Sequence, residues 1–81
     1  MTVNWICEDE GLHRAKCLLR TGEAMHLLVE SLGEHGWDWQ VWNATDYCRT
    51  YYGVADTLMA AKSAVERAFL SEMSSQDKQA A

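Results

Sequence analysis

The stretch GWDWQVW (residues 36–42) holds three of the four tryptophans in the chain, and it decides the fold. Its residues alternate between apolar and polar, and aromatic and β-branched residues dominate, which is typical of a β-strand. The segment AMHLLVES (residues 24–31) has the same strand-like composition, and a glycine-containing loop separates the two. Gly36 suits the positive-φ position that ends a short hairpin loop. We therefore expect residues 24–31 and 37–43 to form an antiparallel hairpin.

The pairing register of this hairpin follows from keeping apolar side chains on one face. We expect Val29 to lie opposite Val41 and Leu28 opposite Trp42. A register two residues away would preserve the same faces, whereas a shift of one residue would mix them.

The segment ADTLMAAKSAVERAFLSEM (residues 55–73) predicts an amphipathic helix that begins after an N-cap at Asp56 or Thr57. The residues after it have little to bury, so we expect a disordered tail over 74–81. The apolar face of the helix is Leu58, Ala61, Val65, Ala68 and Phe69.

Three weaker strand patterns complete the chain, and a glycine lies between most neighbouring segments. Short strands followed by one helix predict an α+β fold. We expect an antiparallel meander of four to five strands, with one C-terminal amphipathic helix packed on one face, in a single domain over residues 1–73. The weaker strands are TVNWIC (residues 2–7), HRAKCLLR (13–20) and DYCRTYYGV (46–54).

Composition limits the function classes that fit the chain. A single domain of 81 residues has little volume to spare for a deep active-site pocket. The net charge of −5 disfavours a strong non-specific nucleic-acid binder. Three cysteines with no metal-site spacing predict reduced, half-buried thiols. The N-terminal residues do not resemble a signal peptide, and we expect a cytoplasmic protein without membrane contact.

No catalytic motif stands out in the sequence. His13 and Cys17 are four residues apart, but this segment reads as a strand, so they would not converge on a metal as they could on a helix. Glu8, Asp9 and Glu10 read as solvated charges on a turn. We expect a non-enzymatic protein with no metal and no cofactor.

Strand alternation divides the aromatic residues between the two faces of the sheet. We expect Trp37, Trp39 and Val41 to pack against the helix. The same face should take these further residues from the neighbouring strands: Met25, Leu27, Val29, Cys48, Tyr52 and Val54.

The opposite face is predicted to carry a candidate interaction surface that combines aromatic residues with a cation. Three alternatives for its cover remain open: the N-terminal strand with Trp5 and Ile6, a second copy of the chain, or a ligand. We expect a small interaction or self-association module, and single-stranded nucleic-acid binding on the aromatic face is the alternative. The candidate residues are Trp42, Tyr51, Leu28, Arg49 and Tyr47.

Residues 36–69 resemble a known type of small domain. A Gly-x-Trp-x-Trp strand, a short strand ending in glycine and an alanine-rich helix are similar to small bacterial and phage domains of unknown function, and loosely resemble the YegP-like domains. The resemblance implies a sheet with one helix, and it brings no catalytic residues.

Overall fold

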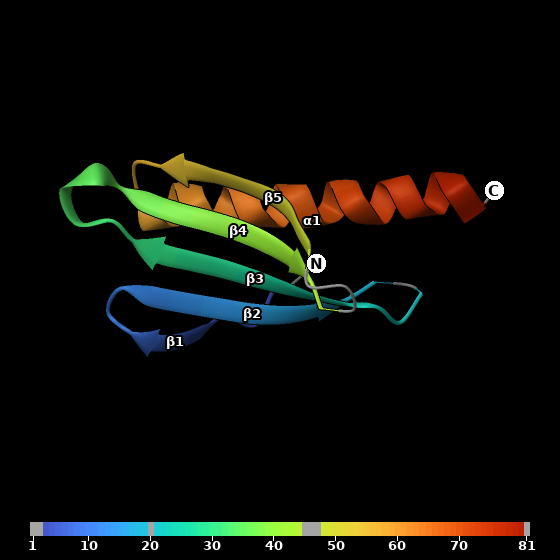
Figure 1. Cartoon of the computed structure of the whole chain (residues 1–81), viewed down its shortest axis with the longest axis horizontal. Helices are drawn as coiled ribbons and strands as arrows, with labels where there is room; N and C mark the ends of the chain where they lie inside the picture. Colours follow the sequence, from blue (N-terminus) through green and yellow to red (C-terminus); the bar gives the residue numbers. More distant parts are fainter. Residues whose placement is uncertain (1–2, 20, 45–47, 81) are drawn as a thin grey trace.

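Five strands and one long α-helix form the protein in the computed structural model, which describes residues 3–19, 21–44 and 48–80, with side chains as far as residue 74. Each strand pairs antiparallel with its neighbours in chain order, and the helix packs against the last three strands. The predicted α+β meander is confirmed (Figure 1). The elements are β1 (Ile6–Asp9), β2 (Leu12–Leu18), β3 (Ala24–Ser31), β4 (Trp37–Asn43), β5 (Cys48–Ala55) and α1 (Leu58–Ala80).

Helix α1 begins at a side-chain cap. Thr57 Oγ1 accepts a hydrogen bond from the backbone N–H of Ala60 at 3.1 Å, so Thr57 is the N-cap. The helix continues to Ala80 and includes residues 74–80, where the sequence pattern predicts a disordered tail. Neither proline nor glycine occurs after Gly53, so no residue breaks the helix there. Figure 1 shows the helix extending well past the ends of the strands.

The β3–β4 hairpin adopts the register two residues away from the expected one. Val29 lies opposite Trp39, and Leu27 lies opposite Val41. A 3₁₀ turn at Gly33–His35 lengthens the loop, which a backbone hydrogen bond from Leu32 N–H to the Gly36 carbonyl closes at 2.8 Å. A shift of two residues keeps every side chain on its predicted face.

The core lies between α1 and one face of the sheet. The predicted apolar face of the helix is confirmed, since its central residues are buried, and so are the predicted positions in β3 and Val41 in β4. Trp37 and Trp39 are half-buried against this core. The fully buried residues are Met25, Leu27, Val29, Val41, Ala61, Val65 and Phe69.

The predicted core positions in β5 are wrong. Tyr52 and Val54 are 65% and 61% exposed, and Cys48 is exposed as well. The residues that turn toward the helix are Tyr51 and Ala55, which both pack against the core. This follows from the pairing of Val41 with Tyr51, because partners in an antiparallel pair share a face.

A β-bulge in β5 explains part of the error. Val41 pairs with Tyr51, but the next residue, Trp42, pairs with Arg49, so Thr50 is the extra residue. The bulge places Arg49 and Tyr51 on opposite faces of the sheet, although they are two residues apart. Simple alternation assigns them to the same face.

Candidate interaction surface on the open sheet face

The sheet face opposite α1, which we call the open face, carries the even-numbered side chains of β2, β3 and β4 together with part of β5. The strand register arranges most of these side chains in three rows that cross the sheet, and the pair Leu18 and Ala24 lies beyond the last row. They are an acidic row (Leu12, Glu30, Asp38, Val54), a middle row (Arg14, Leu28, Gln40, Tyr52) and a basic row (Lys16, His26, Trp42, Arg49).

The structure brings together three of the five predicted surface residues. Leu28, Trp42 and Arg49 lie on the open face, in the middle and basic rows. The placement of Tyr51 is wrong, because Tyr51 faces the helix and its hydroxyl donates a hydrogen bond to Glu72 Oε2 at 3.1 Å. Tyr47 lies outside the described residues.

Lys16 and Tyr52 also belong to the surface, and neither is among the five predicted residues. The position of Lys16 on the open face follows from the alternation of exposed and buried residues in β2, where its neighbour Ala15 is buried. Tyr52 could not be found by the same rule, because the bulge at Thr50 reverses the alternation in β5.

Two consecutive side-chain hydrogen bonds along β4 fix the orientation of Trp42. Its indole Nε1–H donates to Gln40 Oε1 at 2.6 Å, and Gln40 Nε2 in turn donates to Asp38 Oδ2 at 2.6 Å. All three side chains are half-buried. Since the polar edge of the indole is occupied within the strand, the ring presents its apolar surface to whatever meets the open face.

Arg49 and Tyr52 form a second fixed contact on this face. The Arg49 guanidinium lies 4.3 Å from the centroid of the Tyr52 ring, which is a cation–π distance. The contact joins residues on the two sides of the bulge. It holds the Arg49 guanidinium beside Trp42, the residue with which Arg49 pairs on β4.

The N-terminal strand does not cover Trp42. Trp5 lies on the helix side, where its Nε1–H donates to Glu66 Oε1 at 3.4 Å and the Lys62 ammonium is 5.2 Å from its ring centroid. Ile6 pairs with Arg14 on the open face, but it is 58% exposed and lies on β1, three strands from β4. The first of the three predicted covers is therefore wrong.

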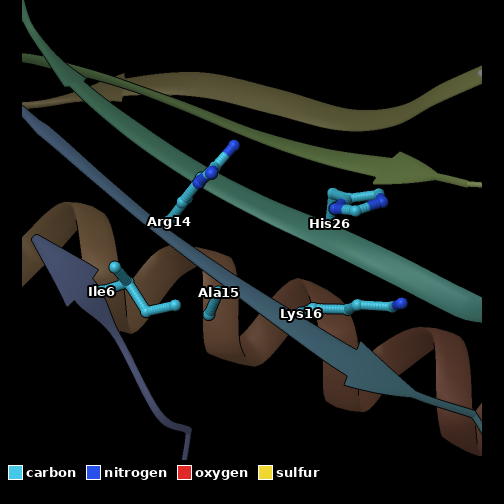
Figure 2. A pocket seen from close by; sticks show the side chains of 5 residues that line it. All are labelled: Ile6, Arg14, Ala15, Lys16 and His26. Atoms are coloured by element: carbon cyan, nitrogen blue, oxygen red, sulfur yellow. The ribbon is translucent and has the colours of Figure 1, made fainter. Parts of the chain in front are cut away.

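A shallow hollow of about 240 Å³ lies on the β1–β2 side of the sheet, as Figure 2 shows. Its size is below that of most ligand pockets. Figure 2 also shows that the nitrogen-bearing ends of Arg14, Lys16 and His26 lie apart from one another, so they do not converge on one atom of a ligand. Ile6 and Ala15 complete its lining.

Two side chains on the helix side have perturbed acidity. Burial, followed by the negative charge of Glu66, raises the pKa of the Cys17 thiol. Burial also raises the pKa of Tyr51, and its hydrogen bond to Glu72 adds to the shift. Neither group lies on the open face.

Among the described residues, no three His, Cys, Asp or Glu side chains are grouped closely enough to hold a metal ion. In the same part of the chain, no helix has the length and apolar character needed to cross a membrane.

Comparison of the chain with protein-family models finds no match, and comparisons with curated proteins and with solved structures find none either. The resemblance to YegP-like domains therefore stays an expectation based on the motif. The functional inference depends on the open face itself.

Proposed function

We propose that the protein is a small, non-enzymatic interaction module and that the open face is its contact surface. One observation carries the proposal: Trp42 is held in a fixed orientation by Gln40 on the sheet face that α1 leaves uncovered. A rigid aromatic ring loses little conformational entropy on binding, and tryptophan and tyrosine are among the residues that dominate the energetics of interfaces.

Exposed apolar side chains support the same surface. Of the seven large hydrophobic side chains that are exposed in the described part of the chain, four belong to the open face. Soluble proteins tolerate single exposed apolar residues, and a contiguous group on one face marks a contact site. The four lie on both sides of the half-buried Leu28 and Trp42, two on β5 and one each on β1 and β2. The four are Ile6, Leu18, Tyr52 and Val54.

The surface can be tested without knowing the partner. Tyr52 would be replaced by the photo-crosslinking residue p-benzoylphenylalanine, which keeps an aromatic ring at an exposed position. Illumination in cells should link position 52 to a defined macromolecule, and Trp42→Ser should reduce that link. The matched control places the same residue at Met59, which is 78% exposed on α1. Equal crosslinking from both positions would contradict the proposal.

Single-stranded nucleic-acid binding is the second candidate, and the basic row favours it. The Trp42 indole lies between His26 and Arg49, and Lys16 is the next residue in the row. An aromatic ring among cations can stack an unpaired base while the cations contact phosphates. Titration with mixed-sequence oligonucleotides at two salt concentrations tests this, because phosphate contacts weaken steeply as salt rises.

The proposed cytoplasmic location rests on the cysteines. Cys7 is an exposed thiol on β1, and such a thiol suits a reducing compartment. Mass spectrometry of the protein after alkylation in its native cells would test this.

A further inference from the structure

The charges of the open face are separated along the strands. Lys16 and Arg49 lie in the basic row, whereas Glu30 and Asp38 lie in the acidic row. The two rows are four residues apart along each of β2, β3 and β4, which is about 13 Å at ~3.3 Å per residue. Screening in physiological salt has a length of about 8 Å, so the two rows attract each other only weakly within one chain.

Arg14, the cation of the middle row, already has a partner. Arg14 Nη2 forms an ion pair with Glu8 Oε1 at 2.6 Å. The middle row therefore presents a neutralised arginine together with Leu28, Gln40 and Tyr52, between a positive row and a negative row.

This pattern is self-complementary under a two-fold rotation. When two open faces stack, a two-fold axis that lies between them and runs across the strands reverses the strand direction of one copy. The acidic row of each copy then lies over the basic row of the other, and the middle rows meet near the axis. An isologous dimer requires a surface that complements itself in this way.

The area of the face is sufficient for such a dimer. Five strands spaced about 4.8 Å apart and about seven residues long, at ~3.3 Å per residue, cover roughly 550 Å² in projection. Two stacked copies would bury roughly 1,100 Å², which exceeds the ~1,000 Å² expected of a specific interface. Sheets stacked face to face lie about 10 Å apart, a gap that side chains such as Trp42 and Leu28 can fill.

We infer that the open face binds the open face of a second copy of this chain, with the strands of the two sheets running antiparallel. The inference rests on the proposed function and specifies its partner. A second copy explains both charged rows, whereas a nucleic acid would use only the basic row and would be repelled by Glu30 and Asp38.

A charge exchange between copies tests the inference. Lys16→Glu and Glu30→Lys change exposed side chains in opposite rows, so neither variant should disturb the fold. In a homodimer of either variant, positions 16 and 30 of the two copies carry like charges in opposing rows, diagonally across the interface on neighbouring strands. Each substitution should therefore raise the dimer Kd at least about tenfold, because like charges brought together across an interface are unfavourable.

An equimolar mixture of the two variants should restore association. In the mixed dimer, the Lys16→Glu copy carries an acidic side chain at both positions, and the Glu30→Lys copy carries a basic side chain at both. The axis stacks each strand on the same strand of the other copy, so position 16 lies over Leu12 and diagonally across from position 30 on the neighbouring strand, about 4.8 Å away along the row. Both diagonal contacts become attractive in the mixed dimer. Sedimentation velocity over micromolar to millimolar concentrations measures each Kd. Arg67→Glu, which makes the same charge change on the exposed side of α1, is the matched control and should leave the Kd unchanged.

Three results would overturn the inference. The first is a wild-type chain that stays monomeric over this whole range. The second is a dimer whose Kd is unchanged by both substitutions, because such a dimer forms through another surface. The third is a monomeric protein that binds a mixed-sequence oligonucleotide. In that case the Lys16→Glu variant would bind the oligonucleotide more weakly than wild type, and the Glu30→Lys variant would bind it more tightly. A monomer whose position 52 still crosslinks to another macromolecule would retain the proposed function, so the two failures are distinguishable.

Discussion

The indole of Trp39 lies directly against Gly53, because a Cβ atom placed at position 53 would be 2.6 Å from Trp39 Cζ2. The two residues are partners on β4 and β5 and share the helix face of the sheet. Gly53 therefore leaves the space that the Trp39 ring occupies.

This contact predicts that Gly53→Ala destabilises the protein. The added methyl group must displace the Trp39 ring or the β5 backbone, which should lower the free energy of unfolding by about 1–3 kcal/mol. Urea denaturation measures the loss. In a Trp39→Leu background the smaller side chain leaves room, so the same substitution should cost clearly less. An equal cost in both backgrounds would show that the Trp39 contact is not the cause.

Trp39 and Trp42 lie on opposite faces of the sheet, so we expect different effects on stability when each is replaced. Trp39→Ala should cost about 3 kcal/mol, the low end for removing a core tryptophan, since Trp39 is only half-buried. Trp42→Ala should cost less than half as much in the monomer, because Trp42 lies on the open face. Thermal melting of dilute samples compares the two. If Trp42→Ala melts at or below the temperature of Trp39→Ala, Trp42 is a core residue and the contact surface loses its main support.

The fold could be predicted from the sequence wherever regular periodicity governs it. The alternation of Trp37, Trp39 and Val41 identified their face, because no bulge interrupts β4 before Val41. The exact register of the hairpin could not be predicted, since two registers two residues apart keep the same faces. The 3₁₀ turn at Gly33–His35 decides between them.

The candidate surface was less predictable because it depends on the β5 bulge. The extra residue is Thr50, and neither glycine nor proline marks the site, so the sequence carries no local signal for it. The bulge moved Tyr51 to the helix side and left Tyr52 on the surface. The predicted cover of Trp5 and Ile6 is also wrong, because neighbouring residues of an extended segment point to opposite faces and only Ile6 lies on the open face.

The raised pKa of Tyr51 predicts that the protein loses stability in alkaline solution. Burial and the hydrogen bond to Glu72 raise its pKa above the ordinary value near 10, so the folded protein keeps this proton more tightly than the unfolded chain. The resulting stability is fully present below the unfolded pKa and is lost as the pH rises through the folded pKa. Urea denaturation from about pH 8 to about pH 11 should show wild type losing stability relative to Tyr51→Phe, beginning near the unfolded pKa. A constant difference between the two proteins would contradict this.

Cys17 is predicted to react slowly with alkylating reagents. Its thiol is half-buried on the helix side, and burial together with the negative charge of Glu66 raises its pKa above the ordinary value near 9. The thiolate is the reactive form, so a raised pKa and reduced access both slow the reaction. Variants that retain only Cys17 or only the exposed Cys7 should differ at least about tenfold in their rate with iodoacetamide at neutral pH.

Two controls separate the causes of this slow reaction. In concentrated urea the Cys17 and Cys7 variants should react at similar rates, because burial is lost. In the folded protein, Glu66→Gln should speed the reaction of Cys17 modestly, since it removes the smaller of the two causes and leaves the burial. If folded Cys17 reacts as fast as Cys7, then Cys17 does not pack against the core as the structure describes.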